Sequence, residues 1–225
     1  MCGRYTLAVP EDALLEAFDV PDLTFDYAPR YNVAPGGPAP VVAEDGDGRR
    51  IGLLEWGFLP SWKDEPTNPF VNARAESVAS KRSFAEAFRR RRCLVPADGF
   101  YEWRSEDGRK VPYWFHPSDG GVISFAGIWE TWRPPGSGDG ADEARHTFAI
   151  LTTDANADVS PVHHRMPVVI PASGRDHWLD RAASVDALED LLSAPPDGAF
   201  EARRVSARVN RADADDARLI EPVDD

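Results

Sequence analysis

Apolar and polar residues alternate along much of the chain, which predicts that β-strands form its core. The turn sequence Asp45-Gly46-Asp47-Gly48 joins two alternating runs and predicts a hairpin. Between Cys93 and Glu130, alternating runs flank a second turn at Asp107-Gly108, so we expect an antiparallel meander there. The predicted strands are residues 2–9, 39–44 and 49–56, those of the meander 93–130, and residues 146–153 and 200–205.

Helical periodicity is confined to short segments between these strands. Acidic residues and an apolar stripe after Pro10 predict a helix. Ser83 and Glu86 have the spacing of a capping box, which predicts a second helix that begins there. Two further short helices are expected at residues 175–179 and 185–192.

Segments rich in proline, glycine or acidic residues predict loops and chain ends. Residues 19–37, which include the sequence Tyr31-Asn32-Val33-Ala34-Pro35, are expected to form a loop. Residues 134–143 are expected to be a solvent-exposed insertion, and the acidic residues 213–225 are expected to fray. Trp56 and Trp62 lie in an aromatic segment where core packing is favoured over a stacking platform.

Length and composition indicate one soluble domain. A chain of 225 residues can bury one substantial core, and no linker divides it. Its two cysteines provide neither a disulfide framework nor the spacing of a metal site, so we expect no metal or cofactor. No apolar run approaches the roughly 18 residues of a membrane span, and the N-terminus lacks a signal segment. We therefore expect a cytoplasmic protein.

The formal net charge of -13 argues against a general affinity for nucleic acid. One region departs from this average, because residues 71–104 contain eight basic and four acidic residues. Such a basic island is compatible with a local phosphate site, and equally with a solvated helix face.

Cys2 directly follows the initiator methionine, which is normally removed before a residue as small as cysteine. Removal leaves an α-amine with a pKa of about 8 beside a thiol with a pKa of about 8.5. This 1,2-aminothiol can condense with an aldehyde to an imine, which the sulfur then closes to a thiazolidine. The alternative is a small apolar residue that opens a strand, which composition alone favours because free cysteines are usually buried.

Three other segments place polar groups in unusual surroundings. Glu102 lies between Tyr101 and Trp103, where desolvation would raise its pKa, although the position could also face water. Asn72 opens a dense polar set, although an asparagine taken alone is more often a turn residue than a site residue. Of the adjacent histidines His163 and His164, which precede Arg165, we expect one at most to be functional.

Together these residues resemble the SOS-response-associated peptidase (SRAP) family of abasic site processing proteins. The resemblance extends from Cys2 to about Asn210 and depends on motifs that occur in order. They are Met1-Cys2-Gly3-Arg4-Tyr5, Tyr31-Asn32-Val33-Ala34-Pro35, Trp56-Gly57 with Pro60 and Trp62, Asn72-Ala73-Arg74-Ala75-Glu76, Arg92 to Trp103, His163 with Arg165-Met166-Pro167, and Val205-Ser206 with Val209-Asn210.

The resemblance implies a covalent sensor of abasic sites in single-stranded DNA. The amine of Cys2 would attack the ring-opened sugar aldehyde, and its thiol would close the thiazolidine. Glu102 would act as general acid and base, His163 would move protons at the sugar, and Asn72 would orient the amine. Weak lyase activity and self-removal of Met1 are further implications. The implied DNA-binding residues are Arg4, Asn32, Arg74, Trp103 and Arg165.

Two local departures from the family pattern concern the site. His164 stands where members of the family commonly carry a carboxylate, and Gly36-Gly37 replaces a polar pair. Two other functions remain open: an N-terminal-nucleophile hydrolase that uses the same residues, and a noncovalent reader of modified bases with a structural Cys2.

The expected fold is a single α+β domain with a mainly antiparallel, barrel-like β core and peripheral helices. We expect the SRAP domain to span residues 1–210, with an acidic tail at 211–225, and the protein to be a monomer.

Overall fold

The computed structural model of the chain describes residues 2–46, 48–137 and 144–223. Its strands are β1 (Tyr5–Leu7), β2 (Arg30–Val33), β3 (Pro38–Asp45), β4 (Gly48–Trp56), β5 (Asn72–Arg74), β6 (Arg92–Ala97), β7 (Gly99–Glu106), β8 (Arg109–Pro117), β9 (Ile123–Trp132), β10 (Arg145–Asp154), β11 (Arg165–Pro167) and β12 (Phe200–Arg204). Its α-helices are α1 (Glu11–Phe18), α2 (Ala75–Val78), α3 (Ala85–Arg90), α4 (Arg175–Leu179) and α5 (Val185–Glu189). Its 3₁₀ helices are η2 (Ala172–Gly174), η3 (Asp190–Leu192), η4 (Ala207–Asn210) and η5 (Ala217–Leu219).

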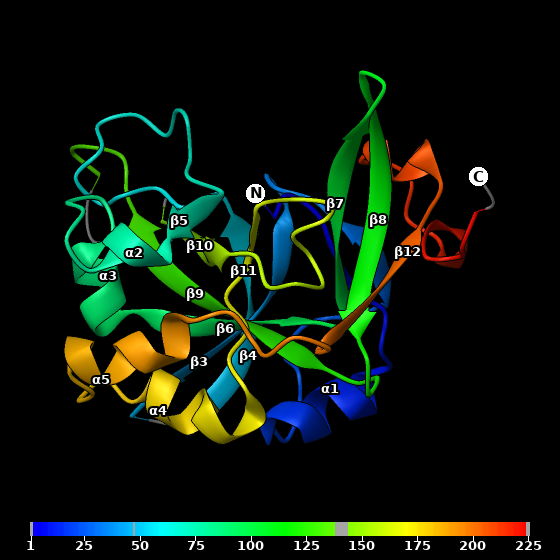
Figure 1. Ribbon diagram of the computed structural model, residues 1–225. Coiled ribbons are helices and arrows are strands. Elements are labelled where there is room, and N and C mark those ends of the chain that lie inside the picture. Colours follow the sequence, from blue (N-terminus) through cyan, green and yellow to red (C-terminus); the bar gives the residue numbers. More distant parts are fainter. Residues whose placement is uncertain (1, 47, 138–143, 224–225) are drawn as a thin grey trace.

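One sheet closes into a barrel. Strands β10, β4, β3, β6 and β9 are neighbours in that order, and β9 pairs again with β10. The pairings within this ring are antiparallel except that of β4 with β10. Helices α3, α4 and α5 lie along one side of the barrel in Figure 1, and α1 lies below it. The predicted α+β fold with a mainly antiparallel, barrel-like core and peripheral helices is therefore confirmed.

The second sheet has the order β12, β8, β7, β1, β2. Its β7–β8 hairpin extends beyond the rest of the molecule in Figure 1. The strands of the predicted meander are present, but they do not pair in chain order. β6 pairs with β9 in the barrel, whereas β7 and β8 belong to the second sheet. Local alternation predicted the strands and could not show that a hairpin leaves one sheet for another.

β1 lies between β7 and the edge strand β2, and it brings the segment that begins at Cys2 into the second sheet. Tyr5 lies opposite Phe100 of β7, and the Tyr101 amide donates to the Arg4 carbonyl at 2.9 Å. A Cβ at Gly99 would collide with the indole of Trp114, so the start of β7 requires glycine for this close approach. The same register, continued toward the N-terminus, places Cys2 beside the part of β7 that carries Glu102.

The prediction of a loop at residues 31–35 was wrong for its first half. Residues Arg30–Val33 form β2, which pairs with β1. Asn32 and Val33 are buried, at 0% and 2% exposure. The strand depends on a partner more than twenty residues away, which the local proline-rich sequence does not reveal.

The helices after Pro10 and at residues 175–179 were predicted correctly. The segment 185–192 is a short α-helix followed by η3, and the Ser184 side chain caps it by accepting a hydrogen bond from the Ala187 amide. The predicted capping box at Ser83 and Glu86 was wrong, because α3 begins at Ala85 without a side-chain cap. The Lys81 carbonyl accepts from the first amides of this turn instead.

Trp56 and Trp62 have different environments. Trp56 is fully buried and stacks on Phe148 with ring centroids 6.2 Å apart, as core packing predicts. Trp62 is 48% exposed and lies 4.6 Å from the guanidinium of Arg82, so the core interpretation was wrong for this residue. The predicted insertion at 134–143 falls partly outside the described residues.

The acidic C-terminal segment was predicted to fray, and this was wrong as far as residue 223. Leu219 of η5 is fully buried in a small apolar cluster with Tyr101, Trp114, Val205 and Val209. The Asp215 carboxylate also accepts from the Tyr31 amide at 2.5 Å. A few apolar residues among many acidic ones were enough to hold the segment against the second sheet.

We predict that Leu219→Ala lowers the free energy of unfolding by about 2–4 kcal/mol, because it empties a fully buried site. Val223→Ala serves as the control and should change stability by less than about 0.5 kcal/mol, since Val223 is 39% exposed. Urea unfolding of the three proteins measures both values. An equally small effect at both positions would show that the segment does not contribute to the folded core.

Candidate active site

The Cys2 thiol lies inside the protein. Its side chain is fully buried, and Sγ is 4.0 Å from the Arg4 carbonyl oxygen. Burial raises the pKa of the Cys2 thiol, and the negative charge of Glu102 acts in the same direction. The thiol is therefore protonated near neutral pH and needs a proton acceptor before it can react as a thiolate.

Asn72 contacts the backbone of Cys2 directly. Its Nδ2 donates a hydrogen bond to the Cys2 carbonyl oxygen at 2.8 Å. Asn72 opens β5 opposite Ile150 of β10, and the buried indole of Trp56 donates to the preceding carbonyl, that of Val71, at 2.9 Å. The Oδ1 of Asn72 is buried and has no hydrogen-bond partner among the residues described. A free acceptor therefore remains beside the N-terminal segment.

Glu102 is buried on β7. Its exposure is 2%, and burial raises the pKa of its carboxyl group to about 7. The flanking aromatic residues anticipated this desolvation, whereas a position facing water, the other interpretation of the sequence, does not occur. A carboxyl group that titrates near neutral pH can both give and accept a proton under physiological conditions.

His163 lies next to this carboxyl group. Its Nδ1 is 3.9 Å from Oε1 of Glu102, and the same nitrogen lies 3.0 Å from the backbone amide and carbonyl of Arg165. Partial burial lowers the pKa of His163, so the imidazole favours its neutral form. The ring of His164 stacks on it at 4.5 Å. The two acid–base groups therefore lie within ion-pair distance but beyond direct hydrogen-bond distance, and the His164 ring supports that of His163.

The four residues assigned to chemistry from the sequence thus lie together between the two sheets. Figure 1 shows the β7–β8 hairpin on one side of this place and the region of β5, α2 and β11 on the other. A cavity of about 430 Å³ opens at this place. Its lining residues are Glu102, Trp103, Lys110, His163 and Asn210.

Lys110 was missed as a site residue, as was Asn210. The Asp107-Gly108 turn fixes the register of the hairpin and places Lys110 opposite Ser105, two residues beyond Trp103. That register was available from the sequence. The cavity could not be anticipated, because it also needs η4 and the turn before β11.

A larger cavity of about 490 Å³ lies away from this site, between the β8–β9 turn, η2 and β12. Most of its lining is apolar. Its buried charged residue, Arg175, donates to Ser124 Oγ and to the carbonyls of Ala17 and Val122. These bonds join α1 to β9, so Arg175 has a structural role there.

The structure corrects the role expected for Asn32. The sequence suggested a contact with DNA, but Asn32 is fully buried and its Nδ2 donates to the carbonyls of Arg211 at 2.9 Å and Ala214 at 2.7 Å. Its Oδ1 accepts from Arg4 Nη1 at 2.9 Å. Asn32 therefore holds Arg4 and the C-terminal segment in place.

Arg4 and Trp103 both bind η4. Arg4 Nη1 donates to the Val209 carbonyl at 2.7 Å, and the Trp103 indole donates to Asn210 Oδ1 at 2.7 Å. The hydrogen-bond acceptors around Arg4 are uncharged, so its positive charge is not cancelled by an adjacent carboxylate among the residues described. Burial lowers the pKa of Arg4.

The other two expected phosphate ligands differ from each other. Arg74 is exposed at the end of β5 and forms no ion pair within the described part of the chain. Arg165 is 8% exposed, and its guanidinium is bound by Glu76 and Asp154. Arg74 can therefore bind an anion without losing an ion pair, whereas the guanidinium of Arg165 is already bound by two carboxylates.

Within residues 2–46, 48–137 and 144–223, no group of three or more His, Cys, Asp or Glu side chains is placed to hold a metal ion. In the same ranges no helix is long and apolar enough to cross a membrane.

Comparison with known proteins connects this geometry with a family. The family model described as "SOS response associated peptidase (SRAP)" matches residues 1–212. The chain is 35% identical over 227 residues to the abasic site processing protein YoqW of Bacillus subtilis, covering 98% of this chain and 99% of that protein. It is 32% identical over 230 residues to the abasic site processing protein YedK of Escherichia coli, covering 99% and 100%.

A vertebrate relative and solved structures extend the similarity. The abasic site processing protein HMCES of Gallus gallus is 32% identical over 231 residues, covering 88% of this chain and 67% of that protein. A crystal structure of a Bacteroides thetaiotaomicron protein matches the fold with a TM-score of 0.85 at 24% identity, covering 99% of this chain and 100% of that one. A crystal structure of a phage-related protein from Bordetella bronchiseptica matches with a TM-score of 0.72 at 29% identity, covering 91% and 94%.

The raised pKa of Glu102 predicts a pH dependence of stability. The group titrates near 4.5 when unfolded and near 7 when folded. Between these values the folded state binds the extra proton, so this group's contribution to stability is present below pH 4.5 and lost as pH rises through 7. We expect the free energy of unfolding of the wild-type protein to fall by about 1–3 kcal/mol between pH 5 and pH 8 because of this group. In Glu102→Gln this fall should be absent. Urea unfolding at both pH values tests this, and identical pH profiles for wild type and variant would contradict it.

Proposed function

The chain belongs to the SOS response associated peptidase family, and on this premise we propose that it processes abasic sites by capturing them covalently in single-stranded DNA. The nucleophile is Cys2 after removal of Met1, a residue outside the described part of the chain. The observation that carries the proposal is the Asn72 hydrogen bond to the backbone of Cys2, beside the buried pair of Glu102 and His163. The names of the relatives support an abasic site as the substrate.

The proposed chemistry joins one aldehyde to one aminothiol with loss of one water. The free amine of Cys2 adds to C1′ of the ring-opened sugar and gives a carbinolamine. Protonation of the carbinolamine hydroxyl expels water and leaves an imine. The sulfur then adds to the same carbon while its proton passes to nitrogen, which closes the five-membered thiazolidine.

The pKa values order these steps. The buried thiol stays protonated, so the amine is the first nucleophile and the sulfur reacts only when the imine is in place. Glu102, with a pKa of about 7, can donate the proton that leaves with water and can accept the thiol proton. His163 lies 3.9 Å from Glu102, so through one bridging water it can return a proton to the Glu102 carboxylate or take one from it between the two steps.

Asn72 holds the reacting amine. Its Nδ2 is occupied by the Cys2 carbonyl, while its buried Oδ1 has no partner among the described residues. An α-amine at Cys2 can donate to this oxygen and aim its lone pair at the sugar. Fixing the nucleophile in this way lowers the entropic part of the barrier.

We place DNA along the face of the molecule that carries the cavity. Arg4 and Arg74 supply positive charge for flanking phosphates, and the Trp103 ring, fixed by Asn210, can stack on a neighbouring base. In this arrangement we expect the protein to bind a single DNA strand as a monomer. An imine at C1′ also acidifies the neighbouring C2′ position, so weak strand cleavage by β-elimination is an expected side reaction. The peptidase in the family description is consistent with self-removal of Met1.

The main test uses mature protein, with Met1 removal verified by mass spectrometry, and a single-stranded oligonucleotide with one abasic site. We predict an adduct that survives denaturing electrophoresis and disappears in Cys2→Ala. Capping the DNA aldehyde with methoxyamine should also prevent it. Absence of an adduct from wild-type protein would refute covalent capture, and an adduct that persists in Cys2→Ala would exclude Cys2 as the nucleophile.

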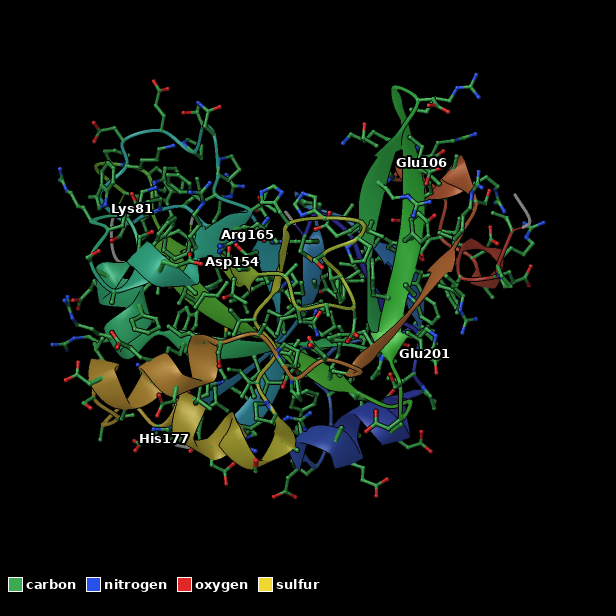
Figure 2. All side chains as sticks on the ribbon, viewed as in Figure 1. Lys81, Glu106, Asp154, Arg165, His177 and Glu201 are labelled. Atoms are coloured by element: carbon green, nitrogen blue, oxygen red, sulfur yellow. The ribbon has the colours of Figure 1, made fainter. Side chains whose placement is uncertain are left out.

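Within the same assay, Glu102→Gln should slow adduct formation at least about 10-fold, the lower end of what a general acid–base contributes. Glu106→Gln is the matched control, because Glu106 lies on the same strand, pairs with Arg104 and does not line the cavity. Figure 2 labels it near the end of the hairpin. Equal rates for the two variants would remove Glu102 from the mechanism.

Lys110 provides a test of the DNA path. In a Cys2→Ala background, Lys110→Gln should weaken binding of single-stranded DNA and reduce the slope of log affinity against log salt by about 0.7, the loss of one phosphate contact. The neighbouring change Arg109→Gln removes the same charge from the same hairpin, but Arg109 does not line the cavity. Indistinguishable slopes for the two variants would show that the cavity mouth is not on the path.

A further inference from the structure

Arg165 is bound by two carboxylates before any DNA is present. Its Nη1 is 2.6 Å from Oε1 of Glu76 and 2.8 Å from Oδ1 of Asp154, and its Nη2 is 3.0 Å from Oε2 of Glu76. Figure 2 shows Arg165 and Asp154 beside each other at the ends of their strands. One positive charge therefore faces two negative charges, and these three groups together carry a net charge of −1.

The two carboxylates are held differently. Glu76 binds both terminal nitrogens of Arg165 in the paired geometry that a guanidinium prefers. It joins α2, and with it the Asn72 segment, to β11 and the His163 turn. Asp154 lies opposite Arg165 across β10 and β11, uses one oxygen and leaves its side chain 87% exposed. Because the Asp154 side chain is open to water, solvent and other anions can compete for its contact with Arg165 more readily than for the paired contact of Glu76.

The surroundings of Arg4 provide a comparison. The acceptors around Arg4 are the Asn32 side chain and backbone carbonyls, which leave its positive charge to attract a phosphate. At Arg165 an approaching phosphate meets Asp154, which offers the guanidinium the same kind of acceptor, an anionic oxygen. A phosphodiester and this carboxylate therefore compete for the same donor.

We propose that Asp154 occupies the position on Arg165 that a DNA phosphate takes during capture, and that it thereby limits the affinity of the protein for undamaged single-stranded DNA. The proposal rests on the proposed function. Glu76 stays in place during the exchange, and no covalent bond changes: one oxyanion replaces another on Nη1 of Arg165. Asp154 is then a specificity-determining residue, since weak noncovalent binding leaves retention on DNA to the reaction at Cys2.

The chain contains a closely matched control for this contact. Asp176 on α4 is also 87% exposed, and its Oδ1 lies 2.7 Å from Nη2 of Arg49, which in turn binds Glu44. Its neighbour His177 appears in Figure 2 on the side of the molecule away from the β7–β8 hairpin. Asp154→Asn and Asp176→Asn therefore make the same chemical change in the same kind of ion pair, at two distant places.

The experiment measures binding of an undamaged single-stranded oligonucleotide in a Cys2→Ala background over a range of salt concentrations. We expect Asp154→Asn to raise affinity about 3- to 10-fold at low salt and to steepen the salt dependence by about 0.7, as one more phosphate contact would. Asp176→Asn should leave both quantities near the Cys2→Ala values. An equal gain in the two variants would reduce the effect to net charge, and no gain or a loss in Asp154→Asn would overturn the proposal.

Two further measurements keep this result separate from the proposed function. Urea unfolding should give similar stabilities for the two variants, which excludes a fold defect as the cause of any difference. Adduct formation on an abasic oligonucleotide is measured separately in proteins that retain Cys2. Failure there would refute covalent capture while the affinity comparison still decides the role of Asp154, because noncovalent binding in Cys2→Ala needs no thiazolidine.

Discussion

The hydrogen bond from Asn72 to the Cys2 carbonyl joins the two sheets of the protein at its N-terminus. Chain ends usually fray, yet the N-terminal nucleophile of the proposed reaction must be held to a fraction of an ångström. The fold meets this requirement from both sides. β1 pairs with β2 and β7 in one sheet, while Trp56 and β10 fix β5, and with it Asn72, in the other. Because the two sheets meet there, the charge of Glu102 acts on the Cys2 thiol, and His163 lies 3.9 Å from Glu102.

Charge is distributed differently in the structure than the basic island of the sequence indicated. Arg90, Arg91 and Arg104 pair with Glu86, Glu130 and Glu106. Arg92 is buried and donates to backbone carbonyls. Much of the basic island therefore forms ion pairs and hydrogen bonds within the protein, and it does not provide a continuous row of phosphate-binding residues. The positive charge available at the site belongs to residues such as Arg4 and Arg74, which form no ion pair within the described ranges. The Glu76 carboxylate nevertheless lies close enough to Arg74 that this charge, after the hydrogen bond from Arg165, lowers its pKa.

Features of the fold and the site could be predicted from the sequence where they depend on neighbouring residues, and could not where they depend on partners distant in the chain. Glu102 was recognisable from its apolar neighbours, and the β3–β4 hairpin from its turn. The family resemblance supplied Asn72 and His163, since nothing local distinguishes them. Asn32 was misassigned and Asp154 was missed for one reason. Both act through partners more than ten residues away, on the C-terminal segment and on β11, and only the folded chain shows what their side chains touch.

A protein with a net charge of -13 is poorly suited to hold DNA by electrostatic attraction. Counterion release makes such binding strongly dependent on salt, whereas a thiazolidine does not loosen as salt rises. If affinity came mainly from phosphates, an aspartate on Arg165 would be a defect. If recognition comes mainly from the aldehyde at Cys2, the same aspartate is useful, because undamaged strands offer only phosphates and are released. The acidic composition and the ion pair at Arg165 then have the same consequence: selectivity resides in the chemistry of Cys2.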